Sequence, residues 1–208
     1  MRQRALSDPN LTGRSVDYHP AMKYTHTAVL TLLCALALPG CNGQHKQDAQ
    51  GATDRAKAEA RYARIQALSG DWYLTRGVRL GVDVEADPDE PFVSYSVSSA
   101  GHSVIEKLFV GKPNEMTSVY YLDDGRLMMD HYCSLGNQPR MVAIDGQENE
   151  IPFKLIVVSN MNNQNDLHIS SHSLEFVGSD ELIARWGATE DQEPMGGSRY
   201  MLKRAQQR

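Results

Sequence analysis

One segment of the chain carries histidine and cysteine at alternating positions, which is the spacing of one face of a β-strand. In residues 126–133 (RLMMDHYC), alternation puts four side chains on the same face: Leu127, Met129, His131 and Cys133. This face is more apolar than the other, so we expect it to point into the core. Cα atoms two residues apart on a strand are roughly 6.6 to 6.8 Å apart. His131 and Cys133 are therefore close enough to share a metal ion or to hydrogen-bond to each other.

A second segment, residues 167–176 (LHISSHSLEF), carries His168 and His172 on one face. These two residues are four apart, which spans roughly 13 Å on a strand, too far for one metal ion to bridge them. A histidine pair at this spacing binds zinc only on a helix. A zinc or haem site would therefore need one of them to meet His131 and Cys133 across the fold. The other interpretation is that all of them are hydrogen-bonded polar residues that line a cavity.

Catalysis by Cys133 with His131 as a base would require an exposed thiol of lowered pKa and an oxyanion site. No nucleophile motif or Gly-rich oxyanion loop stands beside the pair in the sequence, so the residues do not favour an enzyme. Glu106, in the segment SVIEKLF, is either an interior carboxylate or a charge on the sheet surface. Both faces of its strand are equally apolar, so the spacing leaves these alternatives open.

The segment SLGNQPR, residues 134–140, connects two predicted strands. Its Gly and Pro are typical of a hairpin turn, which is the simpler interpretation. The functional interpretation is a loop at the rim of a barrel, in which Asn137, Gln138 and Arg140 hydrogen-bond the head group of a ligand. Turn chemistry explains the Gly and Pro but not Gln138 or Arg140.

The elements that position these residues are predicted to be strands, because hydrophobicity alternates with a period of two after Gly70. The predicted strands cover residues 71–76, 78–84, 92–98, 102–110, 115–122, 126–133, 138–144, 152–159, 167–177, 181–188 and 198–204. Turn-forming residues, such as Asp123-Asp124-Gly125 and Pro194 to Gly197, separate them. No helix long enough for a parallel crossover interrupts them. We expect an all-β fold, an antiparallel meandering barrel of about ten strands closed to hide its edges.

The part of the chain before the barrel is predicted to contain one short α-helix. Residues 55–68 are rich in Ala and Arg, follow the possible N-caps Thr53 and Asp54, and end before Ser69-Gly70. Residues 41–54 are small and polar without an apolar period, so we expect a flexible tether there. The barrel then occupies residues 69–208.

The N-terminal residues resemble a bacterial lipoprotein signal. Residues 28–38 are apolar, follow Lys23 and lead into Leu38-Pro39-Gly40-Cys41, which resembles a lipobox. The apolar run is about half of the roughly 20 residues that span a membrane, so we expect residues 1–40 to be a leader and signal peptide that is removed. Acidic residues and prolines ahead of Met22 suggest that translation starts at Met22.

This resemblance implies that Cys41 is lipidated and anchors the exported chain to a membrane of the cell envelope. Residue 42 is Asn, not the Asp that retains many such proteins at an inner membrane, so the implied location is the outer membrane, facing the periplasm. The lipid membrane is then one partner. Once Cys34 is removed and Cys41 acylated, Cys133 is the remaining thiol, for which burial is the usual environment.

The charge balance argues against nucleic acid as a partner. The chain carries 21 basic and 26 acidic side chains, a net charge of −5, and the predicted leader removes more basic than acidic residues. No run of Lys or Arg provides the positive surface that a phosphate backbone requires.

Gly70-Asp71-Trp72, at the junction of helix and first strand, resembles the opening signature of lipocalins and other calycins. The resemblance implies that Trp72 closes one end of the barrel under a basic residue of the last strand, either Arg199 or Arg204. Residues 98–141 are also similar to an uncharacterised family of exported bacterial proteins with a lipocalin-like barrel. That similarity implies the fold and no activity.

We therefore expect a membrane-tethered lipoprotein whose barrel binds a small amphipathic or hydrophobic ligand, without a cofactor. The candidate ligand-binding residues are Glu106, Met129, His131, Cys133, Asn137, Gln138, Arg140, His168 and His172. Two other hypotheses remain open at this level. One is a structural or partner-binding envelope lipoprotein with a solid core. The other is a zinc or haem site formed by His131, Cys133 and either His168 or His172.

Overall fold

A computed structural model describes residues 42–205 of the chain, with side chains from Gln50 onward. The predictions made for residues 1–41, including the start at Met22 and the lipidation of Cys41, concern residues outside this range.

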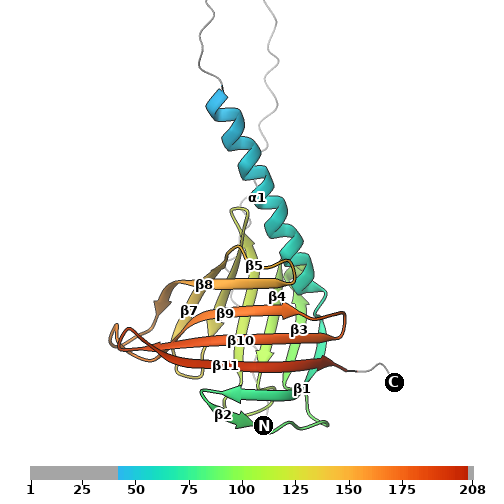
Figure 1. Cartoon of the computed structure of the whole chain (residues 1–208), viewed down its shortest axis with the longest axis vertical. Coiled ribbons are helices and arrows are strands. Elements are labelled where there is room, and N and C mark those ends of the chain that lie inside the picture. Colours follow the sequence, from blue (N-terminus) through green and yellow to red (C-terminus); the bar gives the residue numbers. More distant parts are fainter. Residues whose placement is uncertain (1–41, 206–208) are drawn as a thin grey trace, which may run out of the picture. The chain divides into compact units, whose positions relative to one another are not determined.

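Within the described residues, ten antiparallel strands form a closed barrel, in which each strand pairs with the next and the last pairs with the first (Figure 1). The strands are β1 (Gly70–Arg79), β3 (Val93–Ser98), β4 (Ser103–Leu108), β5 (Met116–Asp123), β6 (Arg126–Tyr132), β7 (Gln138–Ala143), β8 (Glu150–Ser159), β9 (His168–Phe176), β10 (Glu181–Glu190) and β11 (Glu193–Arg204). A short strand, β2 (Val82–Val84), pairs with the end of β1 only. A 3-10 turn, η1 (Ser99–Gly101), joins β3 to β4. The predicted all-β meander is confirmed.

The strand boundaries differ from the prediction at the β10–β11 hairpin. The sequence predicts a turn from Pro194 to Gly197, whereas these residues belong to β11. The turn instead consists of Asp191 and Gln192, whose φ angles are 49° and 65°. Positive φ at both positions is typical of a type I′ turn, whose twist matches that of the two flanking strands. The prediction placed the turn wrongly for two reasons. Pro194, Gly196 and Gly197 are typical turn residues, whereas Asp191-Gln192 is not a typical turn pair.

The helix α1 (Asn42–Gln66) precedes the barrel and is longer than the sequence predicts. Most of the segment expected to be a tether, residues 42–54, is helical. This segment contains no Pro and has Ala, Gln, Lys and Asp among its residues, so nothing in its backbone chemistry forbids a helix. Side chains 50–57 are exposed, and only later does an apolar stripe begin. No helix in residues 42–205 is both long and apolar enough to cross a membrane.

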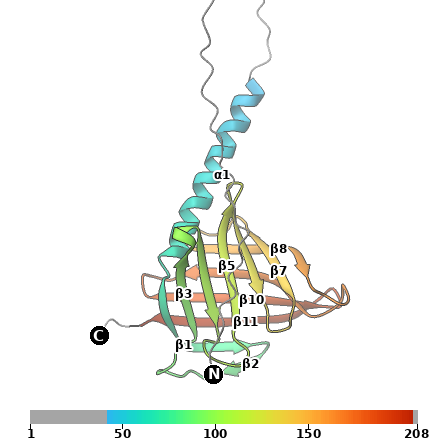
Figure 2. The same ribbon diagram turned by 180° about the vertical axis from the view of Figure 1, so that it is seen from behind.

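The C-terminal part of α1 docks on the barrel. Ala58, Tyr62 and Ile65 are buried and recur at helical spacing, so they form one apolar face, and Leu68 in the turn after the helix is buried beside them. The helix contacts β3, β5 and β6, and Figure 2 shows it beside β3 and β5.

One end of the barrel is closed by Trp72 at the start of β1. Its indole Nε1 donates to the Leu68 carbonyl at 2.8 Å, and the Arg204 guanidinium lies 4.5 Å above its ring centre. Arg204 also donates to the carbonyls of Ala67 and Ser69, both at 2.8 Å. The C-terminal end of α1 is thus joined to β11. Arg199, the other basic residue considered, is exposed.

Candidate functional site

A cavity of about 80 Å³ lies inside the barrel at the end opposite Trp72, and we call it the mouth pocket. Its walls come from the end of β1, the starts of β5 and β9, the middle of β11, the ends of β4, β6 and β10, and the loop after β6. The lining residues are Arg79, Leu80, Leu108, Met116, His131, Cys133, Ser134, Leu135, Leu167, Ile169, Trp186, Ala188, Ser198 and Tyr200. The lining is mostly apolar, which is typical of small-molecule sites.

Two residues of the pocket lining each carry a nitrogen atom that has no hydrogen-bond partner among the described residues. They are His131 Nε2 and Trp186 Nε1, and both are buried. The two rings lie 4.7 Å apart between centres. Buried polar atoms are paired in the great majority of cases, because an unpaired one costs about 1 to 3 kcal/mol. This pair therefore marks the part of the pocket where a ligand atom could bind.

Interior hydrogen bonds hold His131 in place. Ser118 on β5 is its cross-strand neighbour, and Ser118 Oγ lies 3.0 Å from His131 Nδ1. Both side chains are almost fully buried. Burial lowers the pKa of His131 to about 4, because the charged imidazolium would lose its hydration. The ring is therefore neutral at pH 7 and keeps one nitrogen lone pair.

Glu106 has no exposed surface, so its side chain points into the barrel. The sequence had left open whether it lies inside the barrel or on the sheet surface. Tyr95 donates to its Oε1 at 3.0 Å and Tyr120 lies 2.6 Å from its Oε2. Ser118 is the cross-strand neighbour of Glu106. Burial raises the pKa of Glu106, and the three hydroxyls reduce that rise.

His172 lies deeper in the barrel and is paired at both ring nitrogens. Its Nδ1 is 3.0 Å from the Arg185 carbonyl, and its Nε2 is 3.1 Å from the Tyr120 hydroxyl. The ring stacks on Trp186 at 3.8 Å and on Phe153 at 5.6 Å between centres. Burial lowers its pKa to about 3. With both nitrogens engaged, His172 presents no free ligand atom to a metal.

Cys133 and Met129 have different environments on the inward face of β6. The Cys133 thiol is half-buried in the mouth pocket, 3.9 Å from the Met116 sulfur. Burial raises its pKa, so it carries less thiolate than an exposed cysteine and is a weaker nucleophile. Met129 is fully buried in the core and does not line the pocket.

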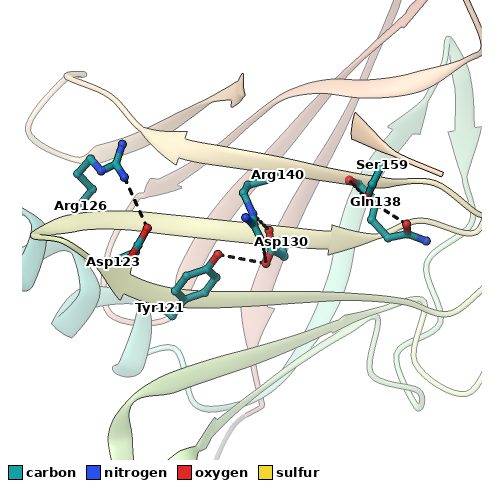
Figure 3. Close-up of polar contacts among 7 residues, drawn as sticks. All are labelled: Tyr121, Asp123, Arg126, Asp130, Gln138, Arg140 and Ser159. Atoms are coloured by element: carbon teal, nitrogen blue, oxygen red, sulfur yellow. Dashed lines mark hydrogen bonds and ion pairs between the residues drawn. The ribbon is translucent and has the colours of Figure 1, made fainter. Parts of the chain in front are cut away.

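The structure places Gln138 and Arg140 away from the pocket. Arg140 is exposed and forms a two-pronged ion pair with Asp130, its neighbour on β6, with N–O distances of 2.7 and 3.1 Å (Figure 3). Gln138 bonds to the Gly136 carbonyl and to Ser159. Both side chains have partners within the sheet surface, so neither is available to a ligand in the barrel.

Asn137 and His168 lie near the rim without lining the pocket. Asn137 is 4 % exposed and donates to the Leu167 carbonyl at 2.9 Å, while its Oδ1 has no partner among the described residues. His168 is half-buried, and its Nδ1 lies 2.8 Å from the Asp166 carbonyl. Asn137 thus connects the loop after β6 to the start of β9.

The described residues contain no group of three or more His, Cys, Asp or Glu side chains arranged to hold a metal ion. His131 and Cys133 share the pocket, but His172 and His168 do not join them there. The composite zinc or haem site considered from the sequence is therefore not formed in this arrangement.

Sequence reasoning missed Trp186, Tyr120, Tyr95 and Ser118 as members of the site. Each occupies an alternating position that can face inward, as Trp186 does between Ala184 and Ala188. Alternation identified the faces of these strands, but not which strands meet across the barrel.

Comparisons with known proteins add no family. The chain matches no model of a protein family, and a search of curated proteins finds no similar sequence.

Proposed function

We propose that this protein is a lipid-anchored envelope lipoprotein whose barrel binds a small ligand in the mouth pocket. The observation that carries the proposal is the pair of buried nitrogens, His131 Nε2 and Trp186 Nε1, without partners among the described residues and beside an apolar cavity. Ligand sites commonly combine apolar walls with a few convergent polar groups. A solid structural core would have no reason to leave two polar atoms unpaired at one place.

The size of the pocket limits the ligand. Its volume of about 80 Å³ is roughly half of the 150 Å³ that holds a benzene molecule in a protein interior. Drug-sized and lipid-sized ligands usually occupy about 300 Å³ or more. The ligand is therefore a molecule of a few non-hydrogen atoms, smaller than the amphipathic compounds that lipocalin-like proteins suggest.

The lipocalin-like part of the proposal rests on the closed end of the barrel. Trp72 under Arg204, next to a helix that precedes the first strand, is the arrangement that the Gly70-Asp71-Trp72 signature implies. The open end then carries the ligand, as in a calycin. The arrangement of Trp72 and Arg204 supports a lipocalin-like fold and does not identify the ligand.

The anchor part of the proposal rests on the lipobox and on the helix next to it. Cys41 directly precedes α1, so an acylated Cys41 would connect the membrane to a helix and not to a flexible tether. The part of α1 before Ala58, the first residue that packs into the core, has 16 residues and is about 24 Å long at 1.5 Å per residue. Such a spacer would hold the barrel at a defined reach from the lipid surface.

Native mass spectrometry of the full-length chain, extracted from its host membrane in mild detergent, tests the ligand. We expect a bound small molecule in the wild type and its loss in Ala188→Leu, which fills the pocket with three extra carbons. The matched control is Ala56→Leu on the exposed part of α1, which should keep the ligand. A wild type without a bound small molecule, or a ligand that persists in Ala188→Leu, contradicts the proposal.

Metabolic labelling with an alkyne fatty acid tests the anchor. The wild type should incorporate the label, Cys41→Ser should not, and the control Cys34→Ser should label normally because Cys34 lies within the signal. Labelling of Cys41→Ser at the wild-type level would overturn the lipidation site.

A further inference from the structure

A second cavity, which we call the side pocket, lies where the pairing of β1 with its neighbours is interrupted. β1 pairs with β3 through residues 70–72 and with β2 through residues 77–79, so residues 73–76 have no strand partner on that side among the described residues. Figure 1 shows the short β2 next to β1. Leu74 from the interrupted segment, the loop after β2 and the turn after β4 line the side pocket. Its volume is about 520 Å³, and it shares no lining residue with the mouth pocket.

The most buried residues of the side pocket are apolar and form its floor. Leu74 is 4 % exposed and Phe109 is 8 % exposed, and both belong to the barrel core. Phe92 packs against Phe109 and Tyr200, with ring centres 5.0 and 4.9 Å apart. An apolar ligand group placed against this floor would leave water, which favours binding. The volume also falls within the roughly 300 to 1,000 Å³ that is usual for ligand pockets.

The rim of the side pocket is acidic. Glu85, Asp87 and Glu90 are exposed residues of the lining, and Lys112 is its one cationic side chain. Lys112 forms an ion pair with Glu90, and Glu90, followed by Asp87, raises the pKa of Lys112. Among the described residues, no salt bridge includes Glu85 or Asp87. With three carboxylates against one ammonium, the lining carries a net charge of −2.

We infer that the side pocket binds an amphipathic organic cation, with its apolar part against Leu74 and Phe92 and its ammonium group at the acidic rim. The apolar floor and the negative rim are complementary to the two ends of such a molecule. This inference goes beyond the proposed function and does not rest on it, because the side pocket and the mouth pocket are separate.

Other classes of ligand fit the side pocket less well. The described residues hold no group of three or more His, Cys, Asp or Glu side chains arranged to hold a metal ion, so the acidic rim is not a metal site. An apolar anion would place its charge beside three carboxylates. Arg79 offers it no counter-charge, because its guanidinium lies 5.0 Å from the ring centre of Phe109 but lines the mouth pocket.

Three probes with one carbon skeleton test the inference: 3-phenylpropylamine, 3-phenylpropanol and 3-phenylpropionate. At pH 7 the first is a cation, the second is neutral and the third is an anion. NMR titration of the full-length chain, labelled at its methyl groups, gives the dissociation constant of each probe. The methyl signals of Leu74 and Val84 report on the side pocket, and that of Ala188 reports on the mouth pocket.

We expect the amine to shift the Leu74 and Val84 signals and to bind about threefold to tenfold more tightly than the alcohol, because each exposed charge pair contributes only modestly. The carboxylate probe should bind more weakly than the alcohol. A salt concentration of about 1 M should remove these differences without weakening the binding of the alcohol, since salt screens exposed charges.

Two variants change the charge of the rim in opposite directions, and all the substituted side chains are exposed. Glu85→Gln combined with Asp87→Asn makes the lining neutral and should abolish the preference for the amine over the alcohol. Lys112→Gln removes the cation and should increase this preference about twofold. The matched control is Asp123→Asn combined with Asp124→Asn, which makes the same change of charge at the β5–β6 turn and should retain the preference.

Equal affinity of the amine and the alcohol at low salt overturns the inference. A preference that is also lost in the control variant overturns it too, because the net charge of the whole chain, −5, would then be its cause. Leu74 and Val84 signals that the amine leaves unmoved have the same consequence, whether or not Ala188 responds. None of these outcomes affects the proposed function of the mouth pocket.

Discussion

At the scale of single residues, the interior of this barrel is unusual in holding a carboxyl group and two histidines without an ion pair between them. Glu106, His131 and His172 lie on different strands, and burial raises the pKa of Glu106 and lowers the pKa of both histidines, which favours the neutral form of each. Neutrality costs less than burying charge, since an isolated ion loses most of its hydration. The stability of the fold should therefore depend on keeping these groups uncharged.

Glu106→Gln should change the free energy of unfolding by less than about 1 kcal/mol, whereas Glu106→Leu should lower it by several. A glutamine amide can donate to Tyr120 and accept from Tyr95, as a protonated glutamate does. Leucine leaves the buried hydroxyls of Tyr95 and Tyr120 without this partner, at about 1 to 3 kcal/mol each. Urea denaturation at pH 7 measures both. If the glutamine variant is as unstable as the leucine variant, Glu106 is charged.

The stability of the wild type should fall as pH decreases from about 6.5 toward 4. An unfolded histidine takes up a proton near pH 6.5, while His131 and His172 resist protonation down to pKa values of about 4 and about 3. The unfolded state therefore binds more protons in this range, and each histidine accounts for a loss of about 2 kcal/mol by pH 5.

Urea denaturation at pH 7 and pH 5 checks this pH dependence. His131→Phe should lose less stability between the two pH values than the wild type, because one titrating group is gone, and the contribution of Glu106 is common to both. The exposed His102→Gln should behave as the wild type. An unchanged pH dependence in His131→Phe would show that His131 has the same pKa in the folded and the unfolded state, which contradicts the lowered pKa.

At the scale of elements, α1 has two parts that differ in burial. Residues 50–57 are exposed, while the last turns bury Ala58, Tyr62, Ile65 and Leu68 against the barrel. Tertiary packing, and not helix propensity, stabilises the second piece. Because the buried positions begin only at Ala58, the residues before it show no apolar period, which is why the sequence predicts a flexible tether for residues 41–54.

Ile65→Ala should destabilise the protein by about 2 to 5 kcal/mol, the range for removing a buried aliphatic side chain. Ile65 has no exposed surface, so the cavity left behind cannot fill with water easily. Glu59→Ala, on the exposed face of the same helix, is the control and should stay within about 0.5 kcal/mol of the wild type. Thermal and urea unfolding measure both. Equal stability of the two variants would mean that α1 does not dock in solution.

At the scale of the whole barrel, pairing of β1 with β11 removes the free sheet edges. The register runs from Trp72 opposite Arg204 to Arg79 opposite Ser198, with one bulge between Leu74 and Arg76. Closed barrels have no unpaired strand to aggregate through. Closure also brings β6 to face the paired strands β9 and β10, and this joins His131 to Trp186, the cross-strand partner of His172.

Hydrogen exchange should therefore show β1 and β11 as protected as β5 and β6. Amides of a closed barrel exchange mainly through global unfolding, because every strand has two partners. β2, which has three residues and a single partner, should exchange much faster and is the internal control. Fast exchange along β1 and β11, comparable with β2, would contradict a closed barrel in solution.

The sequence by itself determined the elements and the inward face of β6. Hydrophobic alternation is a local property of neighbouring residues, so it correctly predicts that Leu127, Met129 and His131 lie in the core. It also indicated the number of strands, from the turns between them. These features depend on contacts within one strand and its next neighbour.

Tertiary structure alone decided which interior side chains meet. Glu106 could not be assigned to a face from two equally apolar sides, and Arg140 was assigned to the candidate site by its place in a loop although its partner, Asp130, lies on the neighbouring strand. Contacts between β5, β9 and β10 join residues far apart in the sequence, such as Tyr120 and His172, and depend on how the barrel closes. Hydrophobic alternation along one strand carries no information on how the barrel closes. Barrel closure determines which residues line the mouth pocket.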